Sequence, residues 1–240
     1  MAQFTLFYED NPLTPGSTIA LSEDTARHAV QVLRMKEGAI IALTNGRGRE
    51  AMCRIEEAGK KRCSVKIEAV EDHREATPRL HLAVAFTKHI ARNEWLLEKA
   101  VELGVTKIIP LVAARVERPK YRLDRWRSIL ASAMIQSQQY WMPELTDATT
   151  FNDVMVQHQD FLKLLPHCEE KMRTPLTNAL ERGKDTLILI GPEGDFTEEE
   201  VILGVAQKAI PITLGRTRLR TETAAIAACA YFHLLNDTAS

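Results

Sequence analysis

The sequence lacks the features that mark disulfide-bonded, membrane-spanning and secreted proteins. Its four cysteines, Cys53, Cys63, Cys168 and Cys229, are scattered, with no Cys-x-x-Cys pair and no cluster with histidine. This spacing favours a reduced protein without structural zinc. No run approaches the roughly 18 apolar residues of a membrane helix. The N-terminal stretch MAQFTLFYED has neither the basic flank nor the long apolar run of a signal peptide. We therefore expect a cytoplasmic protein that contacts no membrane and binds no metal.

The sequence also lacks the glycine motifs of the common nucleotide sites. There is no Gly-x-Gly-x-x-Gly and no Walker-type Lys-Ser/Thr, so neither a dinucleotide site nor a nucleotide-triphosphate site has support. What remains is ordinary globular composition, with 45% hydrophobic and 26% charged residues in a chain of 240. A chain of this length forms one large domain or two small ones and can bury a sizeable core.

Net charge is close to zero, but the basic residues are unevenly distributed. Residues 27–66 hold ten basic side chains against four acidic ones, and residues 115–127 hold six against two. Local basic surfaces can bind phosphate backbones when the total charge is neutral, although a solvated face gives the same pattern. We predict that six residues contact RNA: Arg47, Arg49, Lys60, Lys61, Arg62 and Arg218.

The first 72 residues predict a small β-barrel domain that carries one helix. Residues 22–35 fit an amphipathic helix, which Ser22 can cap and Gly38 can end. Asn45-Gly46 marks a hairpin turn, and the alternation of apolar residues that follows predicts a further strand. The polar stretch 71–78 predicts a linker.

The rest of the chain, residues 76–240, predicts an α/β domain built on a parallel sheet. Five apolar segments alternate with helical patterns: 80–86, 107–113, 161–166, 186–191 and 211–215. Nearly continuous apolar strands interleaved with helices indicate a parallel sheet that is covered on both faces. Ligands of such sheets bind at the carboxyl ends of the strands.

Two loops, which we expect at neighbouring strand ends, contain more glycine or arginine than a strand-to-helix connection requires. In the first loop, residues 191–194 read Gly-Pro-Glu-Gly, and Thr197 and Glu200 form a capping box for the helix that follows. Two glycines permit close approach of the backbone to a ligand. The second loop, LGRTRLRTET at 214–223, places three arginines before a closing apolar helix. Arginines there suit an anionic or RNA substrate.

These loops carry a resemblance to a known family. LIGPEGDFTEEE at 189–200 and LGRTRLRTETAA at 214–225 resemble the signature pair of the SPOUT-class ribosomal RNA uridine-N3 methyltransferases, which act on 16S RNA of the small subunit. HAVQVLRMKEGAIIALTNGRG at 28–48 resembles the PUA-like domain of that family, and EKAVELGVTKIIPL at 98–111 resembles the start of its catalytic domain. The resemblance therefore covers nearly the whole chain.

The resemblance implies a fold, a cofactor and a reaction. The fold is a PUA-like RNA-binding β-barrel domain at 1–72, followed at 76–240 by an α/β parallel-sheet SPOUT methyltransferase domain with a C-terminal trefoil knot. The reaction is methylation of uridine N3 in 16S ribosomal RNA, with S-adenosylmethionine as cofactor. The partners are the RNA, free or in the assembled small subunit, and a second copy of the chain in a homodimer.

The chemistry of this reaction suggests roles for the loop residues. Uracil must lose its imide proton, so a base or a cation that stabilises the resulting charge would help. Glu193 and Glu222 are the candidate catalytic carboxylates, and Arg220 is the candidate cation. The residues expected to bind the cofactor are Ile190, Gly191, Pro192, Glu193, Gly194, Leu214, Gly215, Leu219, Arg220 and Thr223.

The chain departs from the family pattern at several positions. Asp195 replaces the second glycine of the first loop, and Thr217 and Arg218 replace the usual arginine and aliphatic residue of the second. Ile135 and Gln139 stand where the family commonly has glutamate and arginine. The last two bear on RNA or dimer contacts, whereas the cofactor loops remain recognisable.

Two other functions remain open. One is a SPOUT enzyme that methylates ribose 2′-hydroxyls, which is disfavoured because the first helix of the catalytic domain has no Asn-x-x-x-x-x-Arg pattern. The other is a non-catalytic RNA-binding ribosome-assembly protein, against which the intact loops argue. The neighbouring Tyr140 and Trp141 either stack a flipped base or pack in the core.

Overall fold

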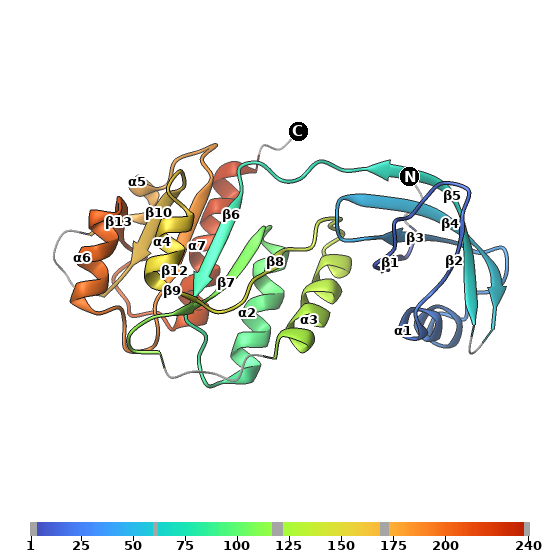
Figure 1. Cartoon of the computed structure of the whole chain (residues 1–240), viewed down its shortest axis with the longest axis horizontal. Coiled ribbons are helices and arrows are strands. Elements are labelled where there is room, and N and C mark those ends of the chain that lie inside the picture. The colour runs from blue at the N-terminus through green and yellow to red at the C-terminus, as the bar shows by residue number, and fades with distance from the viewer. Residues whose placement is uncertain (1–3, 60–61, 117–121, 169–172, 238–240) are drawn as a thin grey trace. The chain divides into compact units, whose positions relative to one another are not determined.

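The computed structural model describes residues 4–59, 62–116, 122–168 and 173–237 (Figure 1). They divide into two compact units. The first contains the chain up to Glu75 together with Met134–Met142, and the second contains Ala76–Ala133 and the chain from Pro143 onward. The sequence analysis placed 134–142 with the second domain, so the first unit draws on two separate stretches of chain. No helix of the described part is long and apolar enough to cross a membrane.

The first unit is built on a five-stranded sheet. In spatial order its strands are β1 (Leu6–Tyr8), β3 (Ile40–Thr44), β4 (Arg49–Ala58), β5 (Cys63–Asp72) and β2 (Thr18–Ala20). β1 runs parallel to β3, and the other neighbours are antiparallel. β3 and β4 form the predicted hairpin, in which Gly46 adopts the positive φ, 67°, that favours glycine. Cys63, Val65 and Ile67 alternate into the core with at most 1% of their surface exposed, as their spacing predicted.

The helix predicted at 22–35 is only partly α-helical. α1 covers Glu23–Arg27, and the chain continues as a π-helix, η1, over His28–Val32. A π turn bonds residue i to i+5 and so holds more residues than an α turn. The residues expected on the buried face of a continuous α-helix are therefore not all buried. Ala29 is fully buried, whereas Leu33 is 41% exposed.

The segment Met134–Met142 packs against the hairpin of the first unit. The carbonyl of Tyr140 accepts a hydrogen bond from the N–H of Gly48 at 2.9 Å, and Trp141 Nε1 donates to the carbonyl of His73 at 3.0 Å. A Cβ at Gly48 would lie 2.4 Å from the Trp141 ring, so only glycine fits there. The aromatic pair is thus held by packing, which favours that interpretation over base stacking.

The second unit is a parallel sheet of eight strands. Its five longer strands match the five predicted segments and lie in the order β13 (Ala209–Thr213), β10 (Leu162–Pro166), β12 (Thr186–Ile190), β6 (Leu80–Val84) and β7 (Lys107–Val112). Three strands of two residues each lie at the edges: β8 (Glu144–Leu145), β9 (Thr149–Thr150) and β11 (Thr174–Pro175). They are too short to show an alternation in the sequence.

Helices cover both faces of this sheet, as the apolar strands predicted (Figure 1). α2 (Ile90–Glu102) packs beside α7 (Thr221–Asn236), which contacts β6 and β12. On the other face α4 (Phe151–Gln157) contacts β7, and α6 (Glu198–Ala206) contacts β13. The remaining helices are α3 (Leu123–Gln136) and the short α5 (Leu176–Ala179).

The strand order places three loops at one end of the sheet. β10 lies between β12 and β13. The two glycine-containing loops therefore do not follow neighbouring strands, and that expectation was wrong. The loop after β10, which begins at His167, lies between them. This loop was not expected from the sequence, because it contains no glycine and no arginine cluster like that of the second loop.

Two histidines form a buried hydrogen-bonded pair in the second unit. His158 Nδ1 lies 2.7 Å from the carbonyl of Val154, and its Nε2 lies 2.9 Å from His81 Nδ1. Because a carbonyl can only accept, His158 donates through Nδ1. Burial lowers the pKa of both histidines, which favours neutral rings, and a neutral His158 then accepts from His81 through Nε2. Burial, followed by the charges of His158, Lys107 and Arg79, lowers the pKa of His81 to about 3.

This pair predicts a loss of stability in acid. An unfolded histidine titrates near pH 6.5, so below that pH the unfolded state binds a proton that the folded state excludes. The free energy of unfolding should fall by about 2 kcal/mol from this group between pH 8 and pH 5. Urea denaturation of the wild type and of His81→Gln at both pH values measures the effect, and the variant should lose less stability. Equal losses would contradict a neutral pair.

Candidate active site

A cavity of about 440 Å³ opens at the carboxyl ends of β10, β12 and β13. Its volume lies within the range of small-molecule sites, roughly 300–1,000 Å³. The loops after all three strands line it, together with the start of α7 and one residue of α2. This is the end of a parallel sheet at which ligands bind.

The first loop, after β12, is anchored by the helix that follows it. The predicted capping box is present: Glu200 accepts from the Thr197 N–H through Oε2 at 2.9 Å, and its own N–H donates to Thr197 Oγ1 at 3.2 Å. Glu200 Oε1 also accepts from the N–H of Ala114 at 2.8 Å, and Arg115 Nη1 donates to the carbonyl of Gly194 at 2.8 Å. The chain after β7 thus holds the first loop, and one arginine of the second basic segment serves this purpose.

Asp195 performs two tasks at the position where the family has glycine. Its φ of 63° lies in the left-handed region, which aspartate tolerates better than most residues. Its Oδ1 accepts from the N–H of Phe196 at 2.9 Å, and its Oδ2 accepts from the N–H of Cys168 at 2.7 Å. The carboxylate therefore ties the first loop to the loop after β10.

Gly191 has a packing role beside the ligand role expected from the sequence. Thr221 Oγ1 donates to its carbonyl at 3.3 Å, which joins the first loop to the start of α7. A Cβ at position 191 would lie 3.1 Å from two carbons of the Phe196 ring, and Phe196 is only 5% exposed. A larger residue would displace that ring as well as enter the cavity, so its effects on fold and ligand would be mixed.

The second loop, after β13, brings two arginines to the cavity. Gly215 has a φ of 125°, which favours glycine, and a Cβ there would meet no atom within 4 Å. Arg218 lies beside Cys168 of the loop after β10, and that side chain raises the pKa of the guanidinium. Arg220 lines the cavity but is exposed, and its side chain has no hydrogen bond or ion pair with any residue that the structure describes.

The structure adds a third arginine to the site, Arg92, in the first turn of α2. Its Nε lies 3.6 Å from Glu222 Oε1, and its Nη1 lies 3.9 Å from Glu193 Oε1. The Glu222 side chain is 13% exposed and that of Glu193 is 63% exposed. Both candidate catalytic carboxylates therefore meet at one guanidinium. Arg92 could not be recognised from the sequence, because only the packing of α2 beside α7 brings it to the cavity.

Most of the residues expected to bind the cofactor line this cavity. They are Ile190, Gly191, Pro192, Glu193, Leu214, Gly215, Leu219 and Arg220. Gly194 instead faces a neighbouring cavity of about 220 Å³, beside Arg115. Thr223 is exposed on α7 and lines neither of these two cavities. His167 and Cys168, which the sequence analysis did not select, line it from the loop after β10.

The residues expected to contact RNA in the first unit lie in different settings. Arg47 and Arg49 each form an ion pair with an aspartate of the same unit. Arg62 is exposed. Lys60 and Lys61 lie outside the described residues. Part of the positive charge counted from the sequence is therefore balanced within the unit, and RNA binding by these residues stays a prediction.

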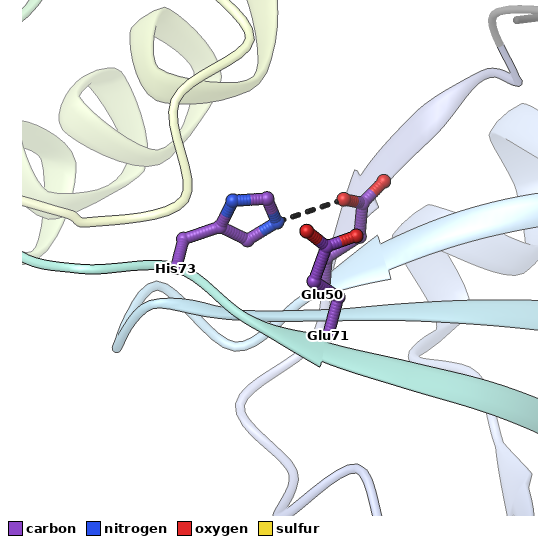
Figure 2. Close-up of side chains that lie close together, drawn as sticks. All are labelled: Glu50, Glu71 and His73. Atoms are coloured by element: carbon purple, nitrogen blue, oxygen red, sulfur yellow. Dashed lines mark hydrogen bonds and ion pairs between the residues drawn. The ribbon is translucent and has the colours of Figure 1, made fainter.

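One group of side chains in the described part of the first unit has the spacing of metal ligands. Glu50 lies opposite Glu71 across β4 and β5, and with His73 their ligand atoms lie within 4.8 Å of one another (Figure 2). His73 Nε2 is 2.9 Å from Glu50 Oε2, and its ring stacks on Tyr140 with centroids 3.8 Å apart. Burial, then the hydrogen bond and charge of Glu50, raise the pKa of Tyr140 to about 12. These contacts account for the group as packing of Met134–Met142, and the absence of a metal stays a prediction.

The sequence matches the model of an RNA methyltransferase domain over residues 74–233 and that of an RNA methyltransferase PUA domain over residues 21–68. The chain belongs to this RNA methyltransferase family. The family resemblance of the two loops is thereby confirmed, as is the α/β parallel-sheet fold with a PUA-like domain.

Relatives of similar length support this assignment. Ribosomal RNA small subunit methyltransferase E of Bacillus subtilis is 31% identical, over 89% of this chain and 90% of its own. The protein of the same name from Rickettsia conorii is 30% identical, over 98% and 97%. A probable rRNA-methyltransferase from Porphyromonas gingivalis superposes with a TM-score of 0.90 at 34% identity, over 97% and 98%. A ribosomal RNA small subunit methyltransferase E from Neisseria gonorrhoeae bound to S-adenosyl methionine superposes with a TM-score of 0.82 at 27% identity, over 98% of both chains.

The conformation of Asp195 generates a stability prediction. Asp195→Gly removes two hydrogen bonds but suits the left-handed backbone, whereas Asp195→Ala removes the same bonds and strains it. We expect the alanine variant to be less stable than the glycine variant by about 1 kcal/mol. Urea denaturation of both variants and the wild type measures the order. An alanine variant as stable as the glycine variant would contradict the backbone conformation.

Proposed function

We propose that the protein is an S-adenosylmethionine-dependent methyltransferase that modifies N3 of a uridine in 16S ribosomal RNA. Family membership and the small-subunit rRNA methyltransferases among its relatives support the RNA substrate. The observation that carries the proposal is the cavity itself, because the two signature loops of the resemblance meet at it through the contact between Thr221 and Gly191. The N3 position rests on the resemblance of those loops.

The lining of the cavity suits S-adenosylmethionine, which carries no phosphate. Ile190, Leu214 and Leu219 provide apolar surface, and Gly191 and Gly215 line the cavity without a side chain, which lets a ligand approach the backbone closely. When bound, the cofactor supplies an electrophilic methyl group. The chain's own residues hold it beside the RNA, and much of the rate enhancement follows from that proximity. We propose that all ten residues of the sequence prediction contribute, including Gly194 and Thr223.

A filled cavity should exclude the cofactor. Ala224 lines the cavity from α7, whereas Ala230, on the same helix and also half-buried, does not. Ala224→Leu should weaken S-adenosylmethionine binding by about tenfold or more, since overpacking costs about 1–3 kcal/mol. Ala230→Leu should leave the affinity unchanged. Titration calorimetry of both variants measures it, and equal affinities would place the cofactor elsewhere.

The uracil chemistry assigns work to the charged residues of the site. Glu193 is largely exposed, so it can take the imide proton and pass it to water. The negative charge left on uracil requires a cation. Two arginines that line the cavity are candidates: Arg220, expected from the sequence, and Arg92, found in the structure.

The PUA-like unit is proposed to supply RNA affinity and not chemistry. Changing Lys60, Lys61 and Arg62 together to alanine should weaken RNA binding and lower the slope of log affinity against log salt by about 2 to 3, because fewer counterions are released. Cofactor affinity should stay the same. Arg54→Ala is the control, because the Arg54 guanidinium is already paired with Glu68. If the triple variant keeps the RNA affinity and the salt slope of the wild type, these three residues form a solvated surface and do not bind RNA.

The methylated atom can be identified directly. Nucleosides from 16S RNA of a deletion strain, with and without a plasmid copy of the protein, are mapped by mass spectrometry. Loss and restoration of N3-methyluridine at one position is the expected result. Loss of a 2′-O-methyl nucleotide instead would favour the ribose methyltransferase. An unchanged methylation pattern would favour the non-catalytic assembly factor.

Assembly and location are further parts of the proposal. We propose domains at 1–72 and 76–240, a C-terminal trefoil knot, a cytoplasmic homodimer, and an active site at the subunit interface. A recess of about 880 Å³ beside the second loop, lined partly by Ala227 and Tyr231 of α7, offers a face for a second copy. Sedimentation equilibrium measures the oligomeric state, and a monomer at micromolar concentration would reject the dimer.

A further inference from the structure

We propose that Arg92, and not Arg220, is the cation that stabilises the negative charge on uracil, and that Glu222 is the positioning residue that holds its guanidinium. This inference rests on the proposed uridine N3 methylation. It assigns a catalytic role to a residue of α2, an element outside both signature loops.

The place of Arg92 in its helix favours a role in the site. A cation in the first turn is opposed by the positive end of the helix dipole. The first turn of α2 contains no acidic residue that would offset it. The carboxylates that do so, Glu193 and Glu222, belong to the first loop and to α7. The positive charge of Arg92 is therefore balanced by acidic residues of the site and not by acidic residues in the first turn of its own helix.

Arg92 is held in advance, as a stabilising cation must be. Preorganised charges act because they need no rearrangement when the new charge develops. Glu222, only 13% exposed, lies beside Nε, and Glu193 lies beside Nη1. A guanidinium has five N–H donors in a fixed fork. The ion pairs with these two carboxylates involve Nε and Nη1, so Nη2 can donate to a carbonyl oxygen of the substrate.

The other arginines of the cavity are less suited to this role. Four arginines of the described chain line it. Arg173 donates to the carbonyls of His167 and Cys168, and Arg218 lies beside Cys168, whose side chain raises the pKa of its guanidinium, so both are engaged with the loop after β10. Arg220 is exposed and has no described partner that would fix its side chain. An unfixed arginine would have to be ordered during the reaction.

The proposed step balances within these groups. The N3–H bond breaks, the proton passes to the carboxylate of Glu193 and then to water, and the electron pair spreads over N3 and the flanking carbonyl oxygens. Arg92 donates a hydrogen bond to one of these oxygens and stays protonated throughout. The N3 pair then bonds the methyl carbon that the cofactor supplies, and the former S–C pair remains on sulfur.

The first test compares single-turnover rates between pH 6 and pH 10 at saturating cofactor and RNA. Arg92→Ala should lower the rate near pH 7 by about two to three orders of magnitude. Its rate should also keep rising to a pH about 2–3 units higher than in the wild type, because the uracil anion is less stabilised by the same factor. Arg92→Lys should restore part of the rate, as should free guanidinium added to Arg92→Ala.

Matched variants separate this role from structural effects. Arg125 pairs with Glu94 in the same unit but does not line the cavity, so Arg125→Ala should leave rate and pH profile unchanged. Arg220→Ala should lower the rate less than Arg92→Ala and leave the pH profile in place. Glu222→Gln should reproduce part of the Arg92→Ala effect. A larger loss and a shifted profile in Arg220→Ala, with a normal profile in Arg92→Ala, would return the role to Arg220.

A binding measurement tests the same idea without methyl transfer. Substrate RNA with 5-fluorouridine at the target position has a more acidic N3–H. In the absence of cofactor, the wild type should bind it more tightly as the pH rises through its ionisation, and Arg92→Ala should show no such gain. Equal gains would overturn the inference. Loss of cofactor affinity in step with rate in Arg92→Ala would also overturn it. A methyl group mapped to an atom other than uridine N3 would instead reject the proposed function.

Discussion

The parallel pairing of β12, β10 and β13 is the constraint on which the site depends. Parallel strands end at the same edge of a sheet, so three loops far apart in sequence meet there. Hydrogen bonds then join them: Thr221 Oγ1 donates to the carbonyl of Gly191, and Asp195 Oδ2 accepts from the N–H of Cys168. The cavity is the space that these loops enclose, and its shape follows from the sheet order.

Charge balance is the second condition on the site. Arg92, Arg173, Arg218 and Arg220 line the cavity together with Glu193 and Asp195, and Glu222 lies beside Arg92. Each acidic group bonds or faces a specific partner, so the surplus of positive charge remains on the exposed arginine side chains of the second loop. Such a distribution attracts an anionic RNA while the fixed pairs hold the geometry. Affinity and chemistry can thus be assigned to different arginines of one cavity.

The sequence predicted the parts of the fold that depend on local pattern. The five apolar strands, the hairpin at Asn45-Gly46 and the capping box of Thr197 and Glu200 each have a signal within a few residues. The strand order has no such signal, and therefore the loop after β10 and the role of Cys168 could not be predicted. Arg92 was missed for the same reason, because its partners lie more than 100 residues away in the chain.

At two places where the chain departs from the family pattern expected from the resemblance, the structure shows which contacts the substituted residues make. Asp195 keeps the left-handed backbone of a glycine and adds two hydrogen bonds that glycine cannot make. At the end of α3, Gln138 adopts a φ of 57°, and the N–H of Gln139 donates to the carbonyl of Met134. Gln139 directly precedes Tyr140, whose ring stacks on His73. The side chain of Asp195 and the backbone of Gln139 both make hydrogen bonds that hold the local chain path, so a substitution is best judged by the contacts it makes and not by its distance from a consensus.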